Sequence, residues 1–387
     1  MFKIKTFNNI SEKGLKLLPG DVYSVGADQK GADAIILRSA NLHDMEINPE
    51  LKAVGRAGAG TNNVPVTSLS EHGIPVFNAP GANANAVKEL VIAGMLIASR
   101  NIVQAWDYAA KIEGTEDEQR KKVEDGKKKF VGFELPGRTL GVVGLGAIGV
   151  QIANAALDLG MRVVGFDPTI TVRSAWQLSA NVQEMPSIDE LLKQSDFVTF
   201  HVPLIDATRN LLNAERLASM KDNIVVLNFA REGIIDDDAV LTGISNGKVH
   251  AYVTDFPSEK LKHNPRVISL PHLGASTNEA EENCAIMVAN QLKDFLQNGN
   301  IRNSVNFPEI KLPRDGECRL AVANRNMPDM VGQISHVLGQ ASANIKHMRN
   351  ESRNGLAYTL IDLDGAIGED VLQQIRNIEG VLNARQL

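Results

Sequence analysis

Short apolar runs alternate with segments of helical periodicity along most of this chain. Phe2–Phe7, Ala34–Leu37 and Thr139–Leu145 are runs of strand length, and longer amphipathic stretches separate such runs. One long helix is expected from about 85 to 111, and another from about 278 to 297. This alternation predicts an α/β architecture with parallel sheets. Further strands are expected at 52–54, 75–77, 162–167, 197–202, 223–228, 249–254 and 266–270.

The pattern changes after residue 297. Residues 298–316 include two prolines and show little periodicity, which predicts a linker. Residues 317–387 have the order strand, helix, strand, strand, helix, strand of a small ferredoxin-like α+β domain. The highly charged segment 113–130 is expected to be a solvated helix end and loop. Alternatively, its three consecutive lysines help to attract an anionic substrate: Lys127, Lys128 and Lys129.

Composition limits the function classes. The chain has 387 residues, of which 43% are hydrophobic, so two or three domains are expected. A formal net charge of -6 gives no indication of a nucleic-acid or membrane-surface partner. Cys284 and Cys318 form no disulfide framework, and cysteines and histidines give no metal-ligand spacing, so we expect no metal and a reducing compartment. The start of the chain has no signal-peptide pattern, and its longest apolar run is about half a membrane span, so a cytoplasmic protein is expected.

The segment GVVGLGAIG contains a dinucleotide-binding pattern. Gly144, Gly146 and Gly149 follow a predicted strand and open a predicted helix, and Asp167 ends the next strand. The glycines permit a tight turn, close approach of a pyrophosphate and close packing of helix on strand. The Asp167 carboxylate can accept hydrogen bonds from an adenosine ribose and repels a 2′-phosphate, so NAD is the expected cofactor. Arg173 keeps NADP as an alternative.

Three polar segments follow predicted strands, at the sheet edge where ligands bind in open α/β folds. They are NFAREG with Arg231, TDFPSE with Asp255 and Glu259, and PHLGAS with His272. A guanidinium can hold a carboxylate in two bonds, and an imidazole can take a hydroxyl proton as hydride leaves. A neighbouring carboxylate can fix the tautomer of that imidazole. Arg231, His272 and Glu259 fit these roles in the oxidation of a 2-hydroxy acid.

Together with GLGAIG, the segments HVPL, NFAREG and PHLGAST occur in the order found in the D-isomer-specific 2-hydroxyacid dehydrogenases. The N-terminal segments LRSA, RAGAGTNNV and GIPVFNAPGANANAVKELV extend this resemblance, which covers about residues 1–307. It implies two Rossmann-like doubly wound parallel-sheet lobes around a cleft. The substrate lobe is then 1–100 plus 283–307 and the NAD lobe 101–282, followed by a linker at 308–316 and the third domain at 317–387.

The segment NRNMPDMVGQISHVLGQASANI (324–345) resembles the start of an ACT domain, a module that senses small molecules. A family member ending in one such domain is expected to oxidise 3-phospho-D-glycerate to 3-phosphooxypyruvate with NAD, the first step of L-serine biosynthesis. One alternative is another family enzyme, such as a hydroxypyruvate or glyoxylate reductase. A second is a non-catalytic NADH-sensing corepressor. The resemblance also implies a homodimer or homotetramer, with serine as the candidate effector.

The resemblance assigns residues position by position. The catalytic set is Arg231, Glu259 and His272. The substrate set is Arg38, Ser39, Ala59, Gly60, Asn83 and Arg231. The cofactor set is Gly144, Gly146, Ala147, Ile148, Gly149, Asp167, His201, Val202, Pro203, Thr208, Asn228, Phe229, Ala230, Asp255, His272 and Gly274. The effector set is Asn324, Asn326 and Asn344.

Two positions depart from the family pattern. The family's Asp stands two residues before the phenylalanine of TDFPSE, but here Thr254 holds that place and Asp255 directly precedes Phe256. We expect Asp255 near the nicotinamide, with a local bulge correcting the one-residue shift. Asn324 stands where serine-inhibited members often carry histidine, which predicts weak or absent inhibition by serine.

Overall fold

The computed structural model describes residues 1–387 and divides them into two compact units. Unit 1 comprises Met1–Asn83 and Asn278–Leu387, and unit 2 comprises Ala84–Thr277. The lobe boundaries predicted at 100/101 and 282/283 therefore need correction. The physical reason is the packing of α3 (Ala84–Ser99), whose buried residues Val87, Val91 and Met95 belong to the core of unit 2.

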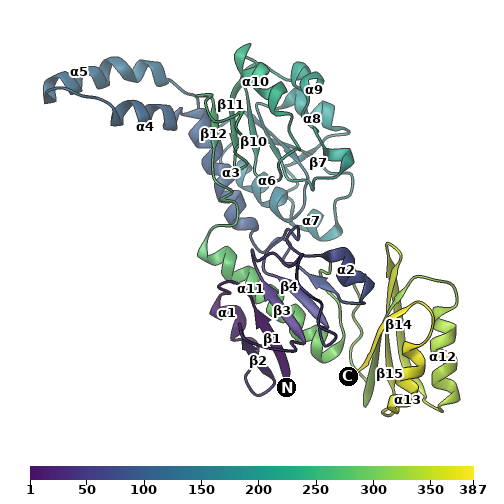
Figure 1. Ribbon diagram of the computed structural model, residues 1–387. Coiled ribbons are helices and arrows are strands. Elements are labelled where there is room, and N and C mark those ends of the chain that lie inside the picture. Colours follow the sequence, from purple (N-terminus) through teal and green to yellow (C-terminus); the bar gives the residue numbers. More distant parts are fainter. The chain divides into compact units, whose positions relative to one another are not determined.

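Unit 2 is built on a seven-stranded parallel sheet of order β12-β11-β10-β9-β6-β7-β8. One face is covered by α3 and α6 (Ala147–Asp158), and the other by α8 (Ile188–Gln194), α9 (Ala214–Ser219) and α10 (Asp237–Ser245) (Figure 1). A separate hydrophobic core lies on each face, which explains the continuous apolar runs of the central strands. The strands are β6 (Thr139–Val143), β7 (Arg162–Phe166), β8 (Gln183–Glu184), β9 (Phe197–Phe200), β10 (Ile224–Asn228), β11 (Val249–Thr254) and β12 (Val267–Ser269).

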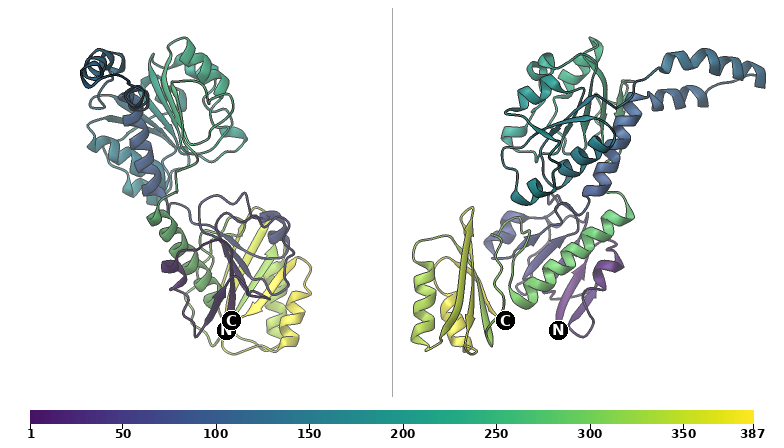
Figure 2. Two further views of the ribbon diagram at one scale, coloured as in Figure 1. Left: turned by 60° about the vertical axis from the view of Figure 1, so that its left-hand side comes forward. Right: turned by 180° about the vertical axis from the view of Figure 1, so that it is seen from behind.

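A helical hairpin projects from unit 2. The prediction of one continuous helix from 85 to 111 is wrong. The segment forms two helices, α3 and α4 (Ile102–Ala110), which are separated at Asn101, whose φ is +50°. The charged segment predicted as a helix end and loop forms α5 (Glu116–Gly126), which Thr115 and Glu118 start with a capping box. Figure 2 shows α4 and α5 side by side, extending away from the sheet of unit 2. We call residues 102–130 the arm.

The first part of unit 1 is a five-stranded parallel sheet of order β2-β1-β3-β4-β5. Helix α11 (Asn278–Asn298) packs on one face with α1 (Glu12–Leu15), and α2 (Val66–Glu71) packs on the other. The sheet is therefore doubly wound, as predicted. Its strands are β1 (Phe2–Thr6), β2 (Tyr23–Gly26), β3 (Ala34–Leu37), β4 (Ala53–Arg56) and β5 (Val76–Phe77).

The C-terminal domain has the predicted order of elements, in an antiparallel sheet of order β14-β15-β13-β16. Helices α12 (Met330–Gln340) and α13 (Glu369–Arg376) cover one face of this sheet. The central strands are also buried on the opposite face, because Ala323, Tyr358 and Leu360 belong to the same core as Phe77 and Phe295 of the parallel-sheet part. Its strands are β13 (Cys318–Arg325), β14 (Ile345–Arg353), β15 (Leu356–Leu363) and β16 (Val381–Gln386).

Three arginines from the linker and the C-terminal domain bind the end of α11. The last four carbonyl groups of a helix have no partner within it. Here Arg385 donates to the carbonyls of Phe295 (2.5 Å) and Leu296 (3.4 Å), Arg314 to that of Gln297 (3.2 Å), and Arg319 to that of Asn298 (2.9 Å). The guanidinium charges also face the negative end of the helix dipole. The predicted linker is thus held in place, with a β-bridge between Ile301 and Ile310.

Gly73 tests how closely the C-terminal domain approaches the parallel-sheet part. Its φ is +70°, and an added Cβ would lie 2.8 Å from the Cβ of Asn383 in β16. Gly73→Ala should therefore lower the free energy of unfolding by about 1–3 kcal/mol more than a glycine substitution that costs backbone strain alone. Gly355→Ala is the matched control, because Gly355 has a φ of +82° and no atom within 4 Å of its Cβ position. Equal urea midpoints for the two variants would contradict this tight approach.

Candidate active site

The glycine-rich turn joins β6 to α6 in unit 2. Gly144 has a φ of +94°, and a Cβ on Gly149 would lie 1.9 Å from the carbonyl oxygen of Gly144. No atom lies within 4 Å of the Cβ position of Gly146. The turn therefore needs glycine for its conformation, for helix packing and for open space in front of the start of α6. Ala147 and Ile148 form the first turn of that helix.

Asp167 follows β7 and is tied to this turn. Its Oδ2 accepts the Leu145 N–H (2.9 Å), and its Oδ1 accepts the Thr169 N–H (2.9 Å). These bonds hold the carboxylate beside the glycines. Oδ1 also accepts the Thr169 hydroxyl (3.2 Å), so Oδ2 is the oxygen that retains a lone pair for a hydrogen bond from a ligand hydroxyl.

The loop after β9 lies against the same turn. A Cβ on Gly144 would be 2.6 Å from the carbonyl oxygen of His201. Nε2 of His201 bonds to Oγ1 of Thr199 (2.8 Å), while its Nδ1 is buried without a partner. Burial lowers the pKa of His201 to about 3, so the ring is neutral near pH 7. The loop continues through Val202 to Pro203, whose carbonyl accepts Thr208 Oγ1 (2.5 Å).

The segment after β10 presents an exposed guanidinium. Asn228 is buried, its Nδ2 donates to the carbonyl of Arg231 (2.9 Å), and its Oδ1 accepts the Ala230 N–H (3.2 Å). The adjacent Phe229 is buried. Arg231 uses one N–H on the carbonyl of Ala230 (2.6 Å), which leaves other donors of its exposed guanidinium facing solvent.

Asp255, His272 and Gly274 lie together at the ends of β11 and β12. Asp255 is 1% exposed, its Oδ2 accepts the Gly274 N–H (3.1 Å), and its Oδ1 is buried without a partner. The His272 N–H donates to the carbonyl of Asp255 (3.0 Å), and the His272 ring packs edge-on against Phe256. Burial raises the pKa of Asp255, although the Gly274 N–H and the charges of His272 and Arg231 oppose the rise.

The shifted position of Asp255 has a local explanation. β11 ends at Thr254, which is buried and accepts the Phe256 N–H on Oγ1 (3.1 Å). Asp255 therefore lies one residue beyond the strand, where strict alternation of side chains no longer applies. The irregularity between β10 and β11 lies at Ile224 and Val225, far along the strand from Asp255. The loop, rather than the expected bulge, sets the direction of this carboxylate.

Glu259 does not lie against His272. Its side chain is 80% exposed and forms an ion pair with Lys262 (2.6 Å). The carboxyl group on which the charge of His272 acts, lowering its pKa, is that of Asp255. The predicted pairing of Glu259 with His272 is thus replaced in this structure by a local ion pair within the loop.

The substrate set of unit 1 follows β3, β4 and β5. Arg38 directly follows β3, and its guanidinium forms an ion pair with Glu281 of α11. Ser39 is exposed beside it. The Ala59 carbonyl accepts Asn78 Nδ2 (2.6 Å), with Gly60 next in the loop, and Oδ1 of Asn83 is buried without a partner.

Two residues of this region were not predicted. Oδ1 of Asn8 accepts three consecutive N–H groups, those of Arg38 (3.3 Å), Ser39 (2.9 Å) and Ala40 (2.8 Å). Glu281 was missed although it follows the PHLGAST motif by only a few residues. Neither carries a spacing signal, because each meets Arg38 only through the fold.

The three asparagines of the effector set have different environments. Asn324 is buried, its Nδ2 donates to the Arg325 carbonyl (2.7 Å), and its Oδ1 has no partner. Asn326 is exposed, and its N–H donates to the Gly355 carbonyl (2.9 Å). Asn344 is exposed and bonds through its amide to Asp364. Only Asn324 has an unused buried acceptor.

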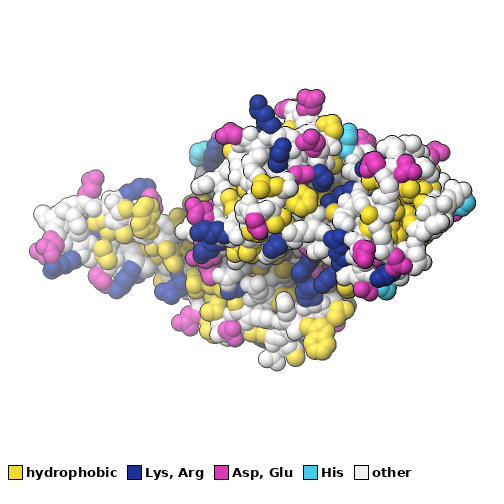
Figure 3. Space-filling view, turned by 90° about the horizontal axis from the view of Figure 1, so that it is seen from below, with side chains coloured by type: hydrophobic (Ala, Val, Ile, Leu, Met, Phe, Trp, Pro, Cys, Tyr) yellow, Lys and Arg dark blue, Asp and Glu magenta, His cyan; other side chains and the backbone are white.

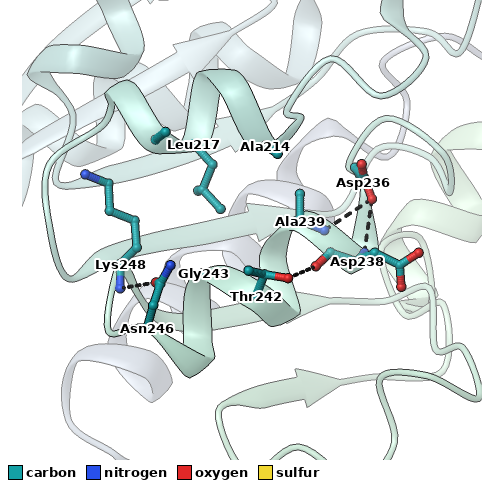
Figure 4. Close-up of a pocket in the computed structure, with 10 residues that line it drawn as sticks. Ala214, Leu217, Asp236, Asp238, Ala239, Thr242, Gly243, Asn246 and Lys248 are labelled. Carbon is teal, nitrogen blue, oxygen red and sulfur yellow. Dashed lines mark hydrogen bonds between the residues drawn. The ribbon is translucent and has the colours of Figure 1, made fainter.

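A pocket of about 520 Å³ lies between α9 and α10 of unit 2 (Figure 4). Asp236, Asp238 and Lys248 supply its charged side chains, and Asp236 is occupied in capping α10. None of the residues assigned to substrate or cofactor lines it.

None of the helices combines the length and hydropathy needed to cross a membrane.

Known proteins resemble the chain over most of its length. Residues 93–274 match the family described as D-isomer specific 2-hydroxyacid dehydrogenase, NAD binding domain. The D-3-phosphoglycerate dehydrogenase of Haemophilus influenzae is 33% identical over 355 residues, which cover 89% of this chain and 83% of the relative. That of Methanocaldococcus jannaschii is 38% identical over 314 residues, or 79% of this chain, but this chain spans only 57% of that relative's length.

Solved structures agree with the fold. The NAD+-bound 3-phosphoglycerate dehydrogenase of Entamoeba histolytica has a TM-score of 0.61 at 25% identity, with 79% of this chain and 98% of that chain covered. The D-mandelate dehydrogenase of Rhodotorula graminis has a TM-score of 0.66 at 21% identity, covering 81% and 99%, which supports the fold alone. By its fold, its strand-end residues and these relatives, the chain belongs to the D-isomer specific 2-hydroxyacid dehydrogenase family.

Proposed function

We propose that this chain oxidises 3-phospho-D-glycerate to 3-phosphooxypyruvate with NAD, the first step of L-serine biosynthesis. The observation that carries the proposal is the convergence of Arg231, Asp255 and His272 at the strand ends of unit 2, on the sheet edge that carries the glycine-rich turn. The substrate is proposed from the relatives named above, which are D-3-phosphoglycerate dehydrogenases.

The residues of unit 2 fit NAD. Gly146 leaves room for a pyrophosphate at the start of α6, and Oδ2 of Asp167 can accept a hydrogen bond from a ribose hydroxyl. The negative charge of Asp167 opposes the 2′-phosphate of NADP. The unpartnered Nδ1 of His201 is a further buried atom that a bound cofactor would satisfy. When bound, NAD accepts the hydride.

In this proposal His272 is the general acid–base, and Arg231 binds the substrate carboxylate. The exposed guanidinium of Arg231 would bind the substrate carboxylate in two bonds and polarise the C2 oxygen. His272 would take the C2 hydroxyl proton at a ring nitrogen. Its backbone is fixed by the Asp255 carbonyl at a φ of +48°. The family pattern assigns Glu259 as the carboxylate partner of His272, but in this structure Glu259 pairs with Lys262.

Arg38 is proposed to bind the phosphate of the substrate, with Ser39 and the loop containing Ala59 and Gly60 around it. The unpartnered Oδ1 of Asn83 would accept a hydrogen bond from a substrate hydroxyl group, because a carbonyl oxygen has no hydrogen to donate to the phosphate. A hydroxypyruvate or glyoxylate reductase would have no phosphate for Arg38, and a corepressor would not turn over substrate. These two alternatives are therefore separated by assay rather than by fold.

We also propose a homodimer formed through the arm. No residue of α4 is buried, and the arm exposes Ile102 (46%), Val103 (41%), Trp106 (70%) and Val123 (46%). Hydrophobic side chains gather on this projection, seen at the left of Figure 3. Exposed apolar surface of this kind is typical of a protein interface.

The C-terminal domain is proposed to bind serine weakly. Asn324 has an unused acceptor, but Asn344 already bonds to Asp364, and neither amide is charged. An ammonium group would be held less firmly by neutral amides than by an ionised side chain.

The central prediction is an activity measurement. Wild-type protein should reduce NAD with 3-phospho-D-glycerate at least tenfold more efficiently than with D-glycerate, with little change on adding serine. His272→Ala should lower kcat by about 10²–10⁴-fold while NAD still binds, because only the acid–base group is lost. Preference for D-glycerate would favour another family enzyme, and absence of turnover with retained NADH binding would favour the corepressor.

The carboxylate partner of His272 can be identified by a matched pair of variants. A nearby carboxylate stabilises the imidazolium, so its loss should move the acidic limb of the kcat/KM profile to lower pH. Because Asp255 is buried and exerts a charge interaction on His272, Asp255→Asn should shift this limb more than Glu259→Gln. A larger shift for Glu259→Gln would assign the role to Glu259.

The arm is tested by light scattering at micromolar concentration. Wild type should have about twice the 41.9 kDa chain mass or a larger multiple of it. Trp106→Glu should shift the protein toward monomer, because a charge would be placed in the proposed interface. Trp176→Glu is the control, since Trp176 is 86% exposed on α7 (Val172–Gln177) outside the arm. A dimer unaffected by Trp106→Glu would exclude this interface.

A further inference from the structure

The guanidinium of Arg38 already has an anionic partner within the chain. Nη1 of Arg38 forms an ion pair with Oε1 of Glu281, which lies in the first turns of α11. The two side chains are 31% and 41% exposed, so solvent and a dissolved anion can reach the pair. A substrate phosphate that binds Arg38 would meet this carboxylate.

The backbone around Arg38 is fixed on both sides. Its N–H donates to Asn8 Oδ1 (3.3 Å), and its carbonyl accepts Arg56 Nε (2.9 Å) and Asn63 Nδ2 (3.2 Å). These bonds anchor the main chain. Exchange of the partner of Arg38 therefore requires motion of side chains only.

A second guanidinium lies in the same cluster. A Cβ on Gly58 would be 1.7 Å from Nη1 of Arg56, so the guanidinium of Arg56 lies directly against this loop position. Nε of Arg56 donates to the carbonyl of Arg38, and the charges of Arg56, Arg38 and Glu281 all act on the buried thiol of Cys284. Two positive charges and one negative charge therefore lie close together near the start of α11.

We propose that Glu281 is an intramolecular competitor for the phosphate site, which holds Arg38 until a phosphate displaces it. This inference rests on the proposed role of Arg38. A phosphate carries close to two charges and three acceptor oxygens, whereas the carboxylate carries one charge and two oxygens. The phosphate therefore displaces the carboxylate, but at the cost of the internal ion pair. Glu281 thereby weakens binding of every anion at Arg38.

The test is Glu281→Gln, which keeps the shape of the side chain and removes its charge. KM for 3-phospho-D-glycerate should fall by roughly two- to fivefold, the range that an exposed ion pair is worth, with the change in KM rather than in kcat. The kinetics of D-glycerate should stay as in wild type, because this substrate has no group that competes for Arg38. Inhibition by sulfate should strengthen by the same factor.

Glu282→Gln is the control, because the neighbouring Glu282 forms its ion pair with Lys13 (2.6 Å) instead. A raised KM for Glu281→Gln would overturn the proposal, since Glu281 would then orient Arg38 for binding. An equal change for D-glycerate would also overturn it. If wild type does not oxidise 3-phospho-D-glycerate, the proposed function fails separately. Sulfate-dependent thermal stabilisation still tests the competition: tighter sulfate binding by Glu281→Gln than by wild type supports it, and equal binding refutes it.

Discussion

The buried ion pair between Arg319 and Asp362 is the constraint on which the arrangement of unit 1 depends. Both side chains are 0% exposed, and Arg319 holds Asp362 through two hydrogen bonds of 2.6 and 2.8 Å. The remaining donors of Arg319 reach the carbonyls of Asn298, Leu312 and Pro313. A charge buried this deeply is tolerated only when every donor is satisfied. The pair therefore fixes the C-terminal sheet, the linker and the end of α11 together.

Helix α11 links that constraint to the substrate set within unit 1. Its C-terminal carbonyls are held by arginines, while Glu281 near its N-terminus holds Arg38. A helix of 21 residues is about 30 Å long, so one rigid element contacts both regions. Any motion of α11 along its axis would have to break hydrogen bonds at one end or the ion pair at the other.

In unit 2, the ends of neighbouring parallel strands bring the candidate functional side chains together. β10, β11 and β12 are neighbours in a parallel sheet, so the residues that follow them share one edge. This is why Arg231, Asp255 and His272 come together although 41 residues of sequence separate the first from the last. Asp255 lies one residue beyond the end of β11, so strand alternation does not set the direction of its carboxylate.

Sequence alone determined the elements that local physics controls. Glycine spacing predicted the glycine-rich turn, and hydrophobic periodicity predicted the strand-end motifs and the order of elements in the C-terminal domain. These signals could be recognised in the sequence because they depend on residues that are close together along the chain. The break at Asn101, the exposed position of Glu259 and the pairing of Arg38 with Glu281 were decided only in the tertiary structure. Glu281 lies 243 residues after Arg38, and the local sequence pattern does not predict which distant charged residue forms an ion pair with a given side chain. Burial of both faces of β13 and β15 in the C-terminal sheet likewise depended on a second surface against which these strands could pack.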